Sequence, residues 1–127
     1  MTDYTQVLTT TDSPEAAERL ARSITAARLA ACVQIIGPIR SIYWWRDKVE
    51  HAQEWQLLIK TTAGRLPELE QHIKANHSYE TPEIIACEIP WGSREYLDWV
   101  TAETRQTGAA AKRSASEIPD ELPSDLP

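Results

Sequence analysis

The chain has 127 residues, 42% hydrophobic and 25% charged, a composition that suits one globular domain and excludes two. Its net charge of −6 provides no attraction to phosphate backbones or anionic lipid, so we expect neither a nucleic acid nor a membrane as partner. The sequence has no apolar run long enough for a membrane span and no signal-peptide pattern at its start, which predicts a cytoplasmic protein.

The composition changes near Thr107. Residues 107–127 contain three prolines and no aromatic residue, and they show no periodic apolar face. Such a segment cannot offset the entropy of ordering its backbone, so we expect a disordered acidic tail. Residues 1–106 are then the folded domain.

The first elements predicted are a strand over residues 4–10 and a helix over residues 15–31. Ser13 and Pro14 resemble a helix start, with a capping oxygen and an early proline. Apolar residues then recur at three- and four-residue spacing, which predicts one face packed on a sheet. These residues are Leu20, Ile24, Ala27 and Ala31.

A long hairpin is predicted next. Residues 32–45 are β-branched and aromatic apart from a pause at Gly37-Pro38, and residues 46–48 form a polar turn. Residues 54–61 return as the antiparallel partner. Apolar residues occupy both parities of these strands, so both faces of the hairpin require burial.

A second helix over residues 65–76, a strand over residues 83–89 and a third helix over residues 93–103 complete the order β-α-β-β-α-β plus a terminal helix. This order predicts an α+β, ferredoxin-like fold with helices on one face of an antiparallel sheet. Two helices cover only one face, so we expect the other to pack against further subunits.

Five blocks of the sequence stand out together. They are Ala31-Cys32-Val33-Gln34-Ile35, Ser41-Ile42-Tyr43-Trp44-Trp45-Arg46-Asp47-Lys48, Lys60-Thr61, His77-Ser78-Tyr79-Glu80-Thr81-Pro82-Glu83 and Tyr96-Leu97-Asp98-Trp99. In order and spacing they closely resemble the CutA family, the divalent-cation tolerance proteins, and the resemblance runs from about Val7 to Thr104. Three positions depart from the family pattern: Asp47 replaces the usual glycine, Gln34 a frequent asparagine and Ser78 a common proline.

The resemblance implies a ferredoxin-like subunit in a tight homotrimer, similar in architecture to the PII signalling proteins. It also implies a cytoplasmic role in tolerance of copper and other divalent metals, with no enzymatic reaction. The resemblance implies a divalent metal ion as cofactor, with copper as the first candidate, bound weakly at intersubunit surfaces. Any protein partner is left unidentified.

Four side chains are candidate metal ligands. Cys32 offers a soft thiolate, although a cysteine at a helix-to-strand junction is more often a small buried hydrophobe. His77, to which the resemblance also points, lies in an irregular loop, where a role as helix cap or loop hydrogen-bond donor is equally expected. One chain has no closed metal-ligand spacing, so His77 is predicted to meet Cys32, Glu54 or Glu80 of a neighbouring subunit. Cys87 is assigned to the core, and His51 and His72 to the surface.

Lys60, Tyr79 and Trp45 are candidates for an intersubunit cleft that binds an anionic small molecule. A Lys60 that is simply solvated at the sheet edge is favoured over this binding role, because the sequence has no glycine-rich phosphate loop. The five tryptophans are assigned to core and interface packing. Two alternatives to metal binding remain: a PII-like trimer that senses a small molecule, and a small-molecule enzyme on the same scaffold.

Overall fold

A computed structural model describes residues 3–105, so the predicted tail lies outside the described residues. The helices and strands, in chain order, are β1 (Tyr4–Thr11), α1 (Pro14–Ala26), β2 (Cys32–Trp45), β3 (Lys48–Thr62), a short 3₁₀ turn (Ala63–Arg65), α2 (Leu66–Ala75), β4 (Ile85–Glu88) and α3 (Arg94–Glu103). None of the helices in this part of the chain has the length and apolar character that a membrane span requires.

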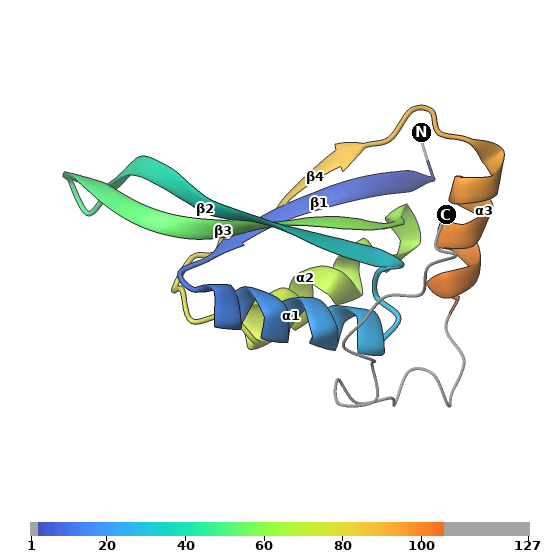
Figure 1. The fold of residues 1–127 in the computed structure, drawn as a ribbon, viewed down its shortest axis with the longest axis horizontal. Coiled ribbons are helices and arrows are strands. Elements are labelled where there is room, and N and C mark those ends of the chain that lie inside the picture. The colour runs from blue at the N-terminus through green and yellow to red at the C-terminus, as the bar shows by residue number, and fades with distance from the viewer. Residues whose placement is uncertain (1–2, 106–127) are drawn as a thin grey trace.

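The four strands form one antiparallel sheet in the order β2-β3-β1-β4. Helices α1 and α2 cover one face of it, and α3 lies at the end opposite the tip of the β2-β3 hairpin (Figure 1). This is the ferredoxin-like arrangement that the order of elements predicted.

The core forms where the two helices meet β1 and β3. Side chains on a strand alternate between its faces, so Val7, Leu57 and Ile59 point together toward the helices. Leu20 and Ile24 of α1 pack on them, and α2 adds its own apolar stripe. The complete buried cluster is Val7, Ala17, Leu20, Ile24, Leu29, Ala30, Leu57, Ile59, Leu69 and Ile73.

Helix α1 ends at Ala26, five residues before the predicted end. Arg28 adopts a left-handed conformation with φ of 60°, its backbone N–H donates to the carbonyl of Thr25, and that of Leu29 donates to the carbonyl of Ile24. These bonds form a Schellman motif, which satisfies the last carbonyls of the helix. The motif usually places glycine where Arg28 stands, so the sequence lacked the ordinary stop signal. Arg28 instead pairs with Glu103 at 2.6 Å, which ties α1 to α3.

The hairpin is longer than predicted because β3 begins at Lys48, directly opposite Trp45, instead of at Glu54. Arg46 and Asp47 form its two-residue loop with φ of 51° and 66°. Positive φ at both positions is the signature of a type I′ turn, which matches the twist of paired strands. Asp47 therefore adopts, at some cost, the conformation for which glycine is preferred.

Large apolar side chains remain uncovered on the hairpin and the open sheet face. Trp44 is 74% exposed and Ile42 62%, and Ile85 of β4 is 51% exposed. Cys87 of β4 is also exposed, which corrects its assignment to the core. It lies opposite Gln6, so it faces away from Val7 and the helices. The parity argument was sound, but it identified the open face instead of the covered one.

His72 is half-buried between α2 and α1, although the sequence assigned it to the surface. Its Nε2 lies 2.8 Å from Ser23 Oγ, and the Ser23 hydroxyl already donates to the carbonyl of Leu20. The imidazole must therefore donate its Nε2 proton to the Ser23 oxygen. His51, in contrast, is exposed on the hairpin as expected.

Replacing Gly37 by alanine is expected to destabilise the protein by about 1–3 kcal/mol through overpacking. A Cβ atom at this position would lie against the Trp55 indole, 2.7 Å from its Cγ. The measurement is the free energy of unfolding in urea. Gly64→Ala is the matched control, because a Cβ there meets nothing within 4 Å. Equal effects of the two substitutions would contradict the assignment.

His72 is expected to make stability depend on pH. Burial lowers its pKa below the ordinary 6.5, so the unfolded chain takes up this proton at a higher pH than the folded chain. The stability contributed by neutral His72 is therefore present above about pH 6.5 and is lost as pH falls below it. The free energy of unfolding should fall less between about pH 7.5 and 5.5 in His72→Gln, which keeps a donor for Ser23, than in the wild type. Identical slopes would contradict this.

Candidate functional site

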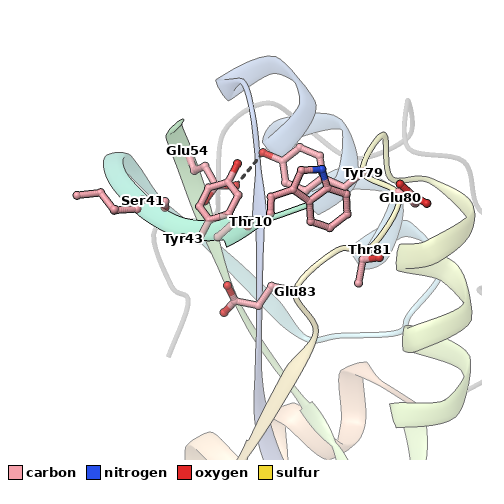
Figure 2. A pocket seen from close by; sticks show the side chains of 10 residues that line it. Thr10, Ser41, Tyr43, Glu54, Tyr79, Glu80, Thr81 and Glu83 are labelled. Atoms are coloured by element: carbon pink, nitrogen blue, oxygen red, sulfur yellow. Dashed lines mark hydrogen bonds between the residues drawn. The ribbon is translucent and has the colours of Figure 1, made fainter. Parts of the chain in front are cut away.

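A cleft of about 560 Å³ lies at the base of the hairpin, where β2 and β3 leave the core. Its walls come from three segments: the end of β1, the hairpin, and the loop between α2 and β4. Figure 2 shows the Tyr79 hydroxyl pointing toward Glu54, with Glu83 on the same loop as Tyr79. The lining residues are Thr10, Ser41, Ile42, Tyr43, Trp45, Glu54, Tyr79, Glu80, Thr81 and Glu83.

Glu54 is the most deeply buried charge of the cleft, at 6% exposure. It lies on the face of β3 opposite Leu57, because side chains alternate along a strand. The Tyr79 hydroxyl donates a hydrogen bond to Glu54 Oε2 at 2.7 Å. Burial, and then the hydrogen bond and charge of Glu54, raise the pKa of Tyr79 well above its ordinary value of 10. Tyr79 is therefore a neutral donor that orients this carboxylate.

His77 anchors the loop that carries Tyr79. Its Nε2 donates to the carbonyl of Thr10 at 2.7 Å, and its Nδ1 accepts the backbone N–H of Tyr79 at 3.0 Å. A carbonyl only accepts and an amide N–H only donates, so the two bonds require the neutral tautomer protonated at Nε2. Both ring nitrogens are occupied within one chain, so binding of a metal ion by His77 would require one of these two hydrogen bonds to break.

Arg46 and Glu80 form the rim of the cleft. The Arg46 guanidinium donates to Glu80 Oε2 at 2.7 Å and lies over the Trp45 ring, 5.3 Å from its centroid. Both charged side chains are largely exposed, so this ion pair contributes little to stability. It does join the hairpin tip to the loop after α2.

Cys32 and Lys60 lie outside this cleft. They face each other across β2 and β3, and Lys60 is six residues from Glu54 along β3, roughly 20 Å away. Lys60 donates a hydrogen bond to the amide oxygen of Gln34. Cys32 is half-buried beside Tyr96, whose pKa is raised by burial and by this thiol. Within one chain, Cys32 does not join His77 or the glutamates predicted with it, and Lys60 does not join Tyr79 and Trp45.

The structure therefore brings together Glu54, Glu80, Tyr79 and Trp45 and separates them from Cys32 and Lys60. Three glutamates and no basic residue line this cleft within one chain, and the anion site predicted at a subunit boundary stays a prediction. Within residues 3–105, no three histidine, cysteine, aspartate or glutamate side chains form a group that could hold a metal ion. The sequence argument missed six lining residues, which become neighbours through strand pairing and through the loop between α2 and β4. They are Thr10, Ser41, Ile42, Tyr43, Thr81 and Glu83.

Comparison with known proteins identifies the family. Residues 5–103 match the family described as CutA1 divalent ion tolerance protein. The chain belongs to this family. The resemblance seen in the sequence is thus confirmed over nearly all of the described residues.

Similar proteins come from a plant, a bacterium and an archaeon. Protein CutA 1, chloroplastic, of Oryza sativa is 46% identical over 101 residues, which are 80% of this chain and 57% of the rice protein. The divalent-cation tolerance protein CutA of Thermus thermophilus is 46% identical over 98 residues, which are 77% of this chain and 95% of that protein.

Solved structures of this family confirm the fold. The crystal structure of CutA1 from Oryza sativa superposes with a TM-score of 0.80 at 43% identity, covering 84% of this chain and 97% of that one. The periplasmic divalent cation tolerance protein CutA of Archaeoglobus fulgidus gives 0.78 at 39% identity, covering 80% and 99%.

Removal of the Tyr79 hydroxyl is expected to destabilise the protein by about 1–3 kcal/mol, because the buried Glu54 carboxylate loses its donor. The measurement is urea unfolding of Tyr79→Phe at a fixed protein concentration. Tyr43→Phe deletes the same group from the same cleft, where it makes no hydrogen bond within residues 3–105, and should have little effect. A smaller loss in Tyr79→Phe than in Tyr43→Phe would refute the pairing.

Proposed function

We propose that this protein serves divalent-cation tolerance as a cytoplasmic homotrimer that binds a copper-like ion weakly through ligands from adjacent copies. Membership of the divalent ion tolerance family supports the physiological role. The proposal assigns it binding and no catalysis, and it involves neither a membrane nor a nucleic acid.

The observation that carries the proposal is the uncovered apolar surface of the hairpin. Among residues 3–105, seven of the nine large exposed apolar side chains belong to β2 and β3. They are Ile35, Ile36, Ile42, Tyr43, Trp44, Trp45 and Val49. Ile42, Trp44 and Val49 share one face of the hairpin, and large apolar side chains left exposed together in this way mark an interaction surface. Packing against copies of the same chain buries it, and the resemblance to the CutA family supplies the number three.

Sharing of metal ligands follows from how one chain spaces them. Cys32 lies at one end of the sheet, and Glu80 and His77 belong to the loop at the other end. Association of copies places different ends of neighbouring sheets side by side, which supplies the missing ligands. A site of this kind has few protein ligands and open positions, so weak binding is expected.

Native mass spectrometry of the full chain with one equivalent of Cu(II) per subunit tests both parts of the proposal. We expect a species with the mass of three chains and a bound metal ion. Metal uptake should fall in Cys32→Ser or in His77→Gln; the latter retains an amide donor for Thr10 and an acceptor for Tyr79 but is a poorer ligand.

Cys87→Ser is the matched control, because it removes the other thiol from an exposed position on β4. Its uptake should equal that of the wild type. A trimer that takes up no copper would overturn the metal assignment and leave the assembly standing. A stable monomer would overturn the assembly, and with it the shared site.

A further inference from the structure

We infer that the cleft at the base of the hairpin binds an organic cation, a small molecule with an ammonium or guanidinium group, in contact with the Glu54 carboxylate. This goes beyond the proposed metal role, because the ligand is an organic molecule; Glu54, a candidate metal ligand in the sequence, is here the partner of its positive charge. The inference depends on the charge, the walls and the size of the cleft.

The cleft carries uncompensated negative charge. Three glutamates line it, and none of its lining residues within 3–105 is basic. Arg46 neutralises Glu80 at the rim, but Glu54 and Glu83 have no ion-pair partner among the described residues. Glu54 matters most, because only 6% of it is exposed and its one hydrogen-bond donor within residues 3–105 is the neutral Tyr79 hydroxyl. Burying an unpaired carboxylate is costly, and a bound cation would remove that cost.

The walls of the cleft suit an organic cation. Tyr43, Trp45 and Tyr79 are all part of the lining, and the faces of aromatic rings attract ammonium and guanidinium groups. The chain itself shows this recognition at the rim, where the Arg46 guanidinium lies over Trp45 and binds Glu80. We infer that a ligand repeats this combination of ring and carboxylate deeper in the cleft, with Glu54 as its anionic partner.

The size of the cleft distinguishes an organic cation from a metal ion. A volume of about 560 Å³ is in the range of small-molecule sites and far exceeds that of a single ion. No group of three metal-ligating side chains exists within residues 3–105. Tyr79 also holds one oxygen of Glu54, leaving the other for a single donor, which matches an ammonium better than a chelated metal.

The test is thermal unfolding and isothermal titration of the full chain, with EDTA present so that metal binding plays no part. The probes are 1,5-diaminopentane and argininamide, with 1-pentanol and pentanoate as neutral and anionic controls. We expect both cations to raise the melting temperature, because a ligand that binds only the folded state stabilises it. Binding should weaken as salt is added. The two controls should have no effect.

Glu54→Gln tests the residue, because glutamine still accepts the Tyr79 hydrogen bond but carries no charge. We expect its affinity for the cations to fall about thirtyfold, the loss typical when one member of a buried charge pair is removed. Glu95→Gln makes the same change of net charge in α3, away from the cleft, and should bind as the wild type does. Glu83→Gln, on the exposed loop, should lose affinity several-fold and serves if the buried variant does not fold.

Two results would overturn the inference. One is that neither cation shifts the melting temperature or gives titration heat. The other is that Glu54→Gln and Glu95→Gln lose affinity equally, which would identify non-specific attraction to an acidic surface. Copper uptake in the absence of EDTA is unaffected by either result, so failure here is separate from failure of the metal proposal.

Discussion

A mismatch between the lengths of strands and helices governs this structure. Strands β2 and β3 have 14 and 15 residues and extend about 45–50 Å, whereas α1 and α2, with 13 and 10 residues, extend about 15–20 Å. One layer of short helices therefore covers only the half of the hairpin that pairs with β1. The remaining half projects beyond the helices (Figure 1), and Ile42, Trp44 and Trp45 are exposed on it. The proposed packing against further copies and the position of the cleft both follow from this.

The cleft lies at the point where β3 leaves the core. Leu57 and Ile59 are the last residues of β3 buried under the helices, and Glu54 follows them toward the hairpin tip on the other face. The loop after α2 returns beneath the hairpin here, held by His77 on Thr10 and by Tyr79 on Glu54. This member of a divalent-cation tolerance family thus has an acidic cleft with aromatic walls, which suits the organic cation that we propose as its ligand.

Local signals in the chain were sufficient for most of the fold. Ser13 caps α1 with its side-chain oxygen, as residue type and position predicted, and Ser93 caps α3 in the same way. The errors occurred where a local signal was weak or had two interpretations. Arg28 performs a turn that usually needs glycine, with a partner 75 residues away. Cys87 alternates correctly along its strand, but alternation does not say which face the helices will cover.

Periodicity and capping residues were enough to establish which helices and strands form and in what order. Short blocks of sequence were enough to establish the family resemblance. The membership of the site was decided in three dimensions. Glu54, Tyr79 and Thr10 are far apart in the sequence, and they meet because strand register and the His77 anchor bring three segments together. Lys60 was separated from them by the same register. Spacing along a chain limits which helices and strands form, but contacts between segments depend on the free energy of packing the whole sheet, which no short stretch of sequence contains.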